Sequence, residues 1–256
     1  MRANLTMNLA KNLKISGNLL YSYCDWRKNN SSGTNRLASV IGSILGAPAT
    51  ITLYNEDGSY SLMQTDFLTG GLNPIAYINE VSDIEYDYRV ISNVALEYKP
   101  ISELTLRLSG NATTTNTRNE YYMTTKYPGS KGNASLSFPQ TVDLNSANTL
   151  TYDKTFNTAH HLTAMAGITY DQTITKRASM SAEQFQSDAG GVFNISGGAI
   201  QNVPSTGYSK WVLLSFLGRL NYSYQSKYLA TLNMRADGSS RYSKGDKWGY
   251  FPSGAL

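Results

Sequence analysis

Apolar and polar residues alternate with a period of two in eight separate segments of this chain. The segments are 3–9, 13–25, 85–98, 103–116, 147–157, 161–173, 209–224 and 228–237, and a ninth begins near Tyr250. Because successive side chains of a β-strand point to opposite faces, each segment is predicted to form a strand with one apolar and one polar face. The longest nearly apolar run, residues 211–218, is far shorter than the roughly 18 residues of a membrane-spanning helix. The chain is therefore predicted to be all-β, without a transmembrane helix.

The connections between these segments are alternately short and long. The short links are residues 10–12, 99–102, 158–160 and 225–227, and the long stretches are 27–84, 117–146, 174–208 and 238–249. Short links join antiparallel neighbours, and outer-membrane barrels have short periplasmic turns and long extracellular loops. A soluble sandwich more often has turns of similar length at both ends. The rhythm therefore favours an antiparallel transmembrane β-barrel segment of about eight or nine strands.

Tyrosine placement supports the membrane interpretation. Tyrosine occurs 19 times against 7 phenylalanines, and only 16% of residues are charged, where about 25% is usual for soluble domains. Tyr88 and Tyr98 share a face ten residues apart. That separation is about 33 Å along the strand and roughly 23 Å along the normal at a 45° tilt, close to the apolar band between two aromatic girdles. Lys154 interrupts an apolar face, and its amine is expected to reach the headgroups.

Residues that could carry chemistry are few and do not form a recognised pattern. Cys24 is the sole cysteine, so no internal disulfide can form, and the net charge of +4 is scattered, which does not suggest nucleic-acid binding. The adjacent His160 and His161 would point to opposite faces of a strand and cannot easily share a metal. Asp237, Gly238 and Ser239 lack the 12-residue pattern of oxygen ligands of a calcium loop, and the Asp-Gly sequence is predicted to open a loop. No catalytic residue, metal or cofactor is predicted.

Several ordered motifs resemble one family. They lie within residues 214–253 and comprise Gly218, Arg219, Asn221, Tyr222 and Tyr224, then Lys227 and Tyr228, then 235–240, and finally Gly249 with 251–253. Residues 70–78, 91–111 and 156–162, the last including His161, add further matches, so that the similarity extends over most of residues 70–256. These motifs resemble the TonB-dependent outer-membrane transporters of the SusC/RagA class.

The resemblance implies a position within a larger protein. Relatives in this class have 22 strands, so residues 1–256 are expected to be part of a receptor β-barrel domain, a central section of its wall. The TonB box, the plug, the carboxyl-terminal strands and a signal-peptide core are not recognised in the sequence. The resemblance implies import of oligosaccharides or peptides across the outer membrane, contact with outer-membrane lipid, a SusD-like lipoprotein partner, and TonB-ExbB-ExbD acting through an N-terminal region. No enzyme activity is implied.

Two other classes stay open at this stage. One is an independent small barrel or adhesin that binds ligands through its loops, since eight strands can close. The other is an outer-membrane hydrolase, which is disfavoured because this sequence contains no Gly-x-Ser-x-Gly motif. For the transporter, Arg219, Arg235 and Arg241 are expected to line the lumen and pair with acidic groups. Loop aromatics could contact nutrient or pack on one another: Trp26, Tyr54, Tyr60, Phe67, Tyr77, Tyr121, Tyr122, Tyr127, Phe185 and Phe193. The first and last strands are expected not to pair, leaving a strongly curved, open sheet.

Overall fold

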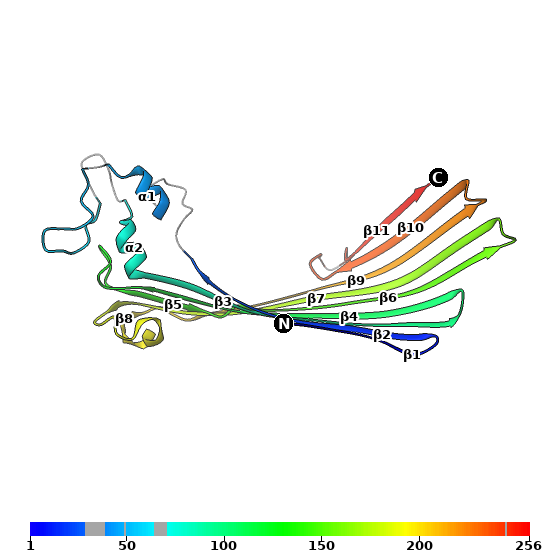
Figure 1. Ribbon diagram of the computed structural model, residues 1–256, viewed down its shortest axis with the longest axis horizontal. Coiled ribbons are helices and arrows are strands. Elements are labelled where there is room, and N and C mark those ends of the chain that lie inside the picture. Colours follow the sequence, from blue (N-terminus) through cyan, green and yellow to red (C-terminus); the bar gives the residue numbers. More distant parts are fainter. Residues whose placement is uncertain (29–38, 49, 64–70, 244) are drawn as a thin grey trace.

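The computed structural model describes residues 1–28, 39–48, 50–63, 71–243 and 245–256. These residues form an 11-stranded antiparallel sheet, which is drawn in Figure 1. The strands are β1 Arg2–Ala10, β2 Leu13–Arg27, β3 Val81–Ile101, β4 Leu104–Met123, β5 Asn133–Ser137, β6 Gln140–Phe156, β7 His160–Phe185, β8 Gly198–Gln201, β9 Ser205–Tyr224, β10 Tyr228–Ser239 and β11 Trp248–Ala255. All predicted strands are present, and the fold class is confirmed.

The sheet is open within the part of the chain that the structure describes. Its order is β1-β2-β3-β4-β5-β7-β9-β10-β11, with β6 also between β4 and β7, and β8 paired with β7. The edge strand β1 pairs only with β2, and the opposite edge strand β11 pairs only with β10. The prediction that the first and last strands do not pair is confirmed for the described residues.

Pro139 divides one position of the sheet into two strands. β5 and β6 both lie between β4 and β7, one continuing the line of the other. Proline has no N–H to donate, so the ladder breaks at this residue. Backbone bonds bridge the break, with Phe138 N–H donating to Ala178 (2.8 Å) and Thr117 N–H donating to the carbonyl of Pro139 (2.9 Å).

Two of the tight turns have the geometry that twisted hairpins prefer. Asn157 and Thr158 have φ of 48° and 56°, and Gln225 and Ser226 have φ of 49° and 53°. In each link an N–H closes the turn across these two residues, from Ala159 to the Phe156 carbonyl (3.2 Å) and from Lys227 to the Tyr224 carbonyl (3.0 Å). Positive φ at both central residues of such a turn is the signature of type I′. The four short links lie at one end of the sheet, which we call the turn end, and the helices gather at the opposite end, the loop end (Figure 1).

The strands extend further toward the loop end than the alternation predicts. β7 runs to Phe185 instead of residue 173, β4 to Met123 instead of 116, and β6 begins at Gln140 instead of 147. β5 and β8 were not predicted at all, because residues 117–146 and 174–208 were assigned to loops. In these extensions polar side chains occupy both faces, so the hydrogen-bonded ladder continues after the alternation has ended.

Asp237 and Gly238 do not open a loop as predicted. Both belong to β10 and pair with β9 on one side and β11 on the other. Gly238 lies under the indole of Trp248, whose nearest ring carbon would be 2.9 Å from a Cβ at this position. A glycine is therefore needed here for close packing of the ring, and not for a turn.

The two faces of the sheet differ in chemistry. One face, which we call the apolar face, exposes large apolar side chains to the surroundings: Leu19, Val90, Val94, Leu108, Leu144, Leu150, Ile168, Phe216, Leu220, Leu232 and Met234. Tyr98, Tyr222 and Tyr228 are exposed on this face near the turn end, and Tyr21, Tyr23, Tyr88 and Tyr170 lie further along the strands. The other face, which we call the polar face, carries amides, hydroxyls and charges. The exposed apolar area is far too extensive for a surface in water.

The loop end contains the main buried cluster of the described residues. Tyr122, Ala134, Ala182, Phe185 and Val192 pack together, the last on a 3-10 helix, η1, at Gly191–Gly197. Two short helices, α1 Val40–Gly46 and α2 Pro74–Glu80, lie at the same end of the sheet (Figure 1). α2 begins where the Asn73 carboxamide accepts from the N–H groups of Ile75 and Ala76, both at 3.1 Å. None of the described helices has the length and apolar character needed to cross a bilayer.

Candidate functional site

A row of five carboxamide side chains and one carboxylate crosses the polar face. Strand register places six residues directly opposite one another on six neighbouring strands: Asn4, Asn18, Asn93, Asn111, Asn145 and Asp171. Each comes from a different strand, from β1 to β7, and all lie on one face because directly opposed residues in antiparallel strands share a face. We call this set the asparagine row.

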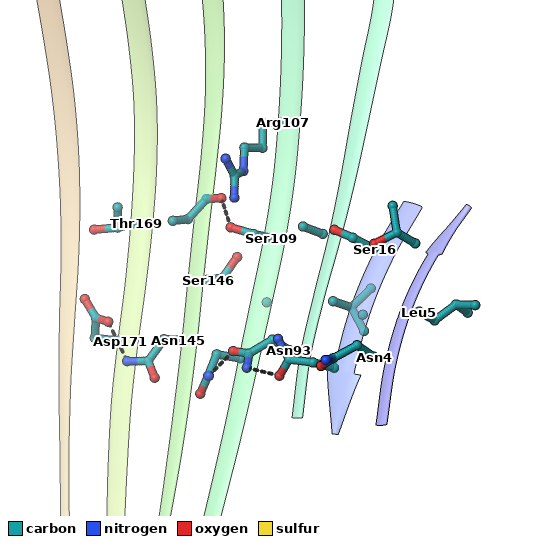
Figure 2. A pocket seen from close by; sticks show the side chains of 18 of the residues that line it. Asn4, Leu5, Ser16, Asn93, Arg107, Ser109, Asn145, Ser146, Thr169 and Asp171 are labelled. Atoms are coloured by element: carbon teal, nitrogen blue, oxygen red, sulfur yellow. Dashed lines mark hydrogen bonds between the residues drawn. The ribbon is translucent and has the colours of Figure 1, made fainter. Parts of the chain in front are cut away.

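Hydrogen bonds join members of the asparagine row (Figure 2). Asn93 Nδ2 donates to Asn18 Oδ1 at 2.7 Å, Asn111 Nδ2 donates to Asn93 Oδ1, and Asn145 Nδ2 donates to Asp171 Oδ1 at 2.7 Å. A carboxamide can both donate and accept, so an asparagine can hydrogen-bond to the side chains on both neighbouring strands. The strand register places these side chains within hydrogen-bonding distance, and the hydrogen bonds in turn stabilise that register.

The asparagine row lies in a hollow of about 690 Å³ on the polar face. Two cationic side chains, Arg107 and Arg235, also line it. Arg235 Nε bonds Asp237 Oδ1 at 2.6 Å, and its Nη2 donates to Ser215 at 3.2 Å. Arg235 therefore meets the prediction of an acidic partner on this face.

The other two arginines singled out by the sequence have different partners. Arg219 Nε donates to the Asn233 carboxamide at 2.7 Å, which is not an acidic group. Arg241 stacks on Trp211, with its guanidinium carbon 4.6 Å from the ring centroid. For both residues, the ion pairs expected from the sequence are replaced by these contacts in the structure.

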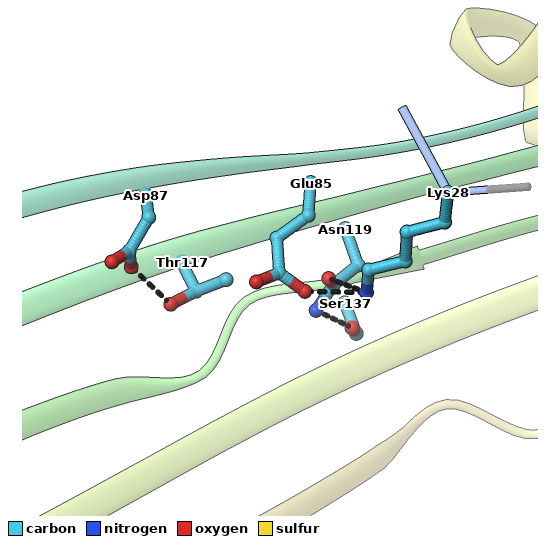
Figure 3. Close-up of polar contacts among 6 residues, drawn as sticks. All are labelled: Lys28, Glu85, Asp87, Thr117, Asn119 and Ser137. Atoms are coloured by element: carbon cyan, nitrogen blue, oxygen red, sulfur yellow. Dashed lines mark hydrogen bonds and ion pairs between the residues drawn. The ribbon is translucent and has the colours of Figure 1, made fainter. Parts of the chain in front are cut away.

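A second polar row lies nearer the loop end (Figure 3). Lys28 forms an ion pair with Glu85 and donates to Asn119 Oδ1 at 3.3 Å, and Asn119 donates to Ser137 Oγ at 3.1 Å. Thr117 Oγ1 donates to Asp87 at 2.8 Å on the same face. Neither row was predicted from the sequence. The recurrence of Asn or Glu on the polar side of successive strands could have indicated them.

The arrangement suits reversible binding of polar groups. Carboxamides, hydroxyls and paired charges can exchange hydrogen bonds with a hydroxylated or amide-containing ligand. Within the described residues, no cluster of three His, Cys, Asp or Glu side chains has a metal-binding arrangement.

The two histidines lie on opposite faces, as predicted. His161 Nε2 is 3.0 Å from Asp153 Oδ1 on the polar face, and Thr163 donates to the same carboxylate at 2.8 Å. His160 belongs to the strand β7 itself, not to a turn as expected, and its Nδ1 is 2.6 Å from the Tyr222 hydroxyl on the apolar face. Its ring lies 4.8 Å from that of Tyr224. His160 is therefore part of the aromatic cluster at the turn end.

Lys154 contacts protein groups in the structure. Its amine is 3.5 Å from Glu103 Oε1 and 5.6 Å from the centroid of the Phe156 ring. Within the protein this amine pairs with the neighbouring turn, and its contact with the headgroups stays a prediction.

Several loop aromatics pack on one another. Tyr122 and Phe185 make an edge-to-face contact with centroids 5.6 Å apart, and the Tyr54 and Tyr60 rings are 5.4 Å apart. Burial raises the pKa of the Tyr121 hydroxyl to about 12, with nearby Tyr77 adding to the effect. Of the predicted set, Phe67 lies outside the described residues.

Asp188 ties the segment after β7 to β4. Its carboxylate accepts from the Tyr122 hydroxyl (2.8 Å), the Thr125 N–H (3.0 Å) and the Thr125 hydroxyl (2.7 Å). Partial burial acts to raise the pKa of Asp188, but the bonds from Thr125 and Tyr122 outweigh it and hold that pKa below its usual value. These contacts fix the loop end as a unit.

Taken together, the two faces define a protein class. A wide antiparallel sheet with an exposed apolar face, a polar face and tight turns at one end is a transmembrane β-barrel wall. No family model matches the chain.

Comparison with known proteins gives the family. The chain is 30% identical over 98% of its length to TonB-dependent receptor P26 of Formosa agariphila, and 32% identical over 85% of its length to receptor P3 of the same organism. A stretch covering 17% of the chain is 61% identical to the TonB-dependent receptor SusC of Bacteroides thetaiotaomicron. The RagAB peptide importer in its open-open state superposes with a TM-score of 0.84 over 99% of the chain at 21% identity, which shows the shared fold. The chain belongs with the SusC/RagA-like TonB-dependent receptors.

The similarity concerns a segment of these relatives. The chain spans 25% of the length of P26, 22% of P3 and 28% of the RagAB chain.

Proposed function

We propose that residues 1–256 form part of the barrel domain of a SusC-like transporter, contributing wall and extracellular loops to the import of oligosaccharides or peptides. The observation that carries this proposal is the division of one continuous sheet between an exposed apolar face and a polar face crossed by the asparagine row. The apolar face would meet outer-membrane lipid, and the polar face would line the interior. The plug and the TonB box would lie outside these residues.

The turn end would face the periplasm and the loop end the cell exterior. Short turns and longer loops distinguish these two sides in outer-membrane barrels. The loop end contains the helices α1 and α2 and the packed cluster around Tyr122, whereas the described strands at the turn end are joined only by short links. A SusD-like lipoprotein would contact this loop end, and TonB-ExbB-ExbD would act through a region beyond these residues.

The relatives do not all point to one class of cargo. RagAB is described as a peptide importer, and SusC is a relative of higher local identity. The amide and hydroxyl groups of the polar face suit either cargo, because both present hydrogen-bond donors and acceptors.

The proposal is tested by deleting the coding gene in its host and measuring uptake of labelled oligosaccharides and peptides. We expect loss of uptake of one cargo class, restored by the intact gene and abolished by a protonophore. Orientation is tested separately with an epitope at Gln225 or at Asp188. Antibody should reach the second on whole cells and the first only after permeabilisation. Unchanged uptake of every cargo, or the reverse labelling, would count against the proposal.

A small closed barrel is not supported by the described residues. Closure of an independent barrel would require β1 to hydrogen-bond with β11 or β10. β1 pairs with β2 alone, which leaves both edges of the sheet open.

A further inference from the structure

The apolar face ends at a distinct row of polar and aromatic residues. Register aligns six of them on neighbouring strands: Tyr23, Tyr88, Asn116, Gln140, Lys176 and Tyr208. On the turn-end side of this row, the next residues on the same face include Val90, Val142 and Ile174. The row therefore marks the level at which the apolar face gives way to polar surroundings.

A cleft of about 420 Å³ opens on this row. It lies where Pro139 interrupts the ladder between β5 and β6. Tyr88 and Phe138 supply apolar lining, and Arg118 and Lys176 supply positive charge. The cleft thus combines an apolar wall with cations at the border of the apolar face.

The cations at this level are incompletely neutralised within the described residues. Lys176 and Lys210 are both exposed on the apolar face, and neither has a carboxylate within ion-pairing distance. Arg118 pairs with Glu120 at 2.5 Å, but its Nε atom is buried without a hydrogen-bond partner. No carboxylate lines the cleft within the described residues, and the charge of Glu120 is paired with that of Arg118.

Aromatic groups flank these cations. The guanidinium of Arg118 lies 5.5 Å from the centroid of the Phe193 ring. Tyr208, directly opposite Lys176, and Tyr88, across the cleft, are both exposed. Tyrosines with one polar end are favoured where an apolar layer meets a wet one.

We propose that this cleft binds the phosphorylated headgroup of a lipid in the outer leaflet. Lys176, which lines the cleft, would contact the phosphate directly. Lys210, directly opposite Ile174 and one step nearer the turn end, would extend its amine back toward the phosphate along the apolar face. The acyl chains would lie along Val90 and Ile174. Basic pockets at membrane level bind anionic headgroups through such contacts. The inference rests on the proposed outer-membrane function, which supplies the bilayer against this face.

The test measures lipid binding directly. The complete receptor carrying this segment is purified in neutral detergent, freed of lipid and titrated with diphosphoryl lipid A, monitored by native mass spectrometry. The variant Lys176→Gln/Lys210→Gln should bind about thirtyfold more weakly, given the usual contribution of each lysine near an anionic surface. Fully dephosphorylated lipid A should bind the unmodified receptor equally weakly.

Matched variants separate the site from general charge loss. Lys11→Gln/Lys14→Gln removes two charges at the turn end and should leave binding within about twofold of the unmodified receptor. Lys176→Arg/Lys210→Arg keeps the charge and should retain binding. Equal binding by the glutamine variant and the unmodified receptor would overturn the inference.

Two further outcomes are informative. Inorganic phosphate should compete only weakly, because it lacks the apolar contacts. If it bound as tightly as lipid A, the site would be one for free anions and the lipid inference would be overturned. The detergent titration does not depend on transport, so loss of uptake in the gene deletion together with lysine-independent lipid binding would refute this inference alone.

Discussion

Asn93 on β3 donates a 2.7 Å hydrogen bond to the carboxamide of Asn18 on β2, 75 positions earlier in the chain. Asn93 also accepts a hydrogen bond from Asn111 on β4. It is thus the centre of a three-strand network, and strands distant in sequence are held in one register by identical side chains.

Replacing Asn93 by alanine should therefore weaken the sheet. The substitution removes two side-chain bonds and leaves polar groups of Asn18 and Asn111 unpaired in a half-buried position. We expect a loss of about 1–3 kcal/mol in the free energy of unfolding, measured by denaturant titration of the receptor in detergent. Asn8→Ala, at an exposed position on β1, is the control and should have little effect. Equal effects of the two variants would argue against the network.

Gly167 on β7 should not tolerate a side chain. A Cβ here would lie 2.6 Å from Leu217 Cδ1 and 3.1 Å from the Asn148 carbonyl oxygen. The leucine can rotate away, but the backbone oxygen cannot move without disturbing the ladder, so Gly167→Ala should cost about 1–3 kcal/mol of stability. Gly110→Ala is the matched control, since its Cβ would come no closer than 3.9 Å to any neighbouring atom. Thermal unfolding of both variants checks the prediction, and equal melting temperatures would contradict it.

Acidification should release the segment after β7. The folded pKa of Asp188 is lowered below the ordinary 3.8, so the carboxylate contributes stability above pH 3.8 that is lost as pH falls through the folded pKa. Residues 186–197 should then exchange amide hydrogens faster, measured by mass spectrometry at a series of pH values after correction for intrinsic exchange.

The variant Asp188→Asn should show faster exchange already at neutral pH. It keeps the size of the side chain but removes the charge that Thr125 and Tyr122 contact. Asp25→Asn, at an exposed position on β2, is its control. Exchange in residues 186–197 that is independent of both pH and Asp188 would show that other contacts hold this segment.

The β9–β10 turn should become more stable with a better turn sequence. Gln225 and Ser226 have φ of 49° and 53°, which side chains other than glycine and asparagine adopt at a cost. The double variant Gln225→Asn/Ser226→Gly should gain about 0.5–2 kcal/mol in the free energy of unfolding. The same pair introduced in the β1–β2 link, Lys11→Asn/Asn12→Gly, where neither residue has a positive φ, gives a reference without that gain. No gain at the first site would mean that the turn conformation carries little strain.

The sequence by itself determined the two-faced strands and the positions of the tight turns. Alternation in residues 85–98 and 228–237 is local, because a strand's side chains change face at every residue. The shared motifs around Gly218 and Arg235 also sufficed to indicate the family. For these features the sequence needed no knowledge of which strands are neighbours.

Only the tertiary structure decided which polar residues meet. Asn18, Asn93 and Asn145 form one row through strand register, which depends on pairings across tens of residues. The continuation of β7 to Phe185 could not be predicted from the sequence, because polar side chains on both faces remove the alternation there. The strand continues because its backbone hydrogen-bonds to the neighbouring strands. The cleft beside Pro139 has the same origin, because it depends on the neighbours that β4 and β7 provide.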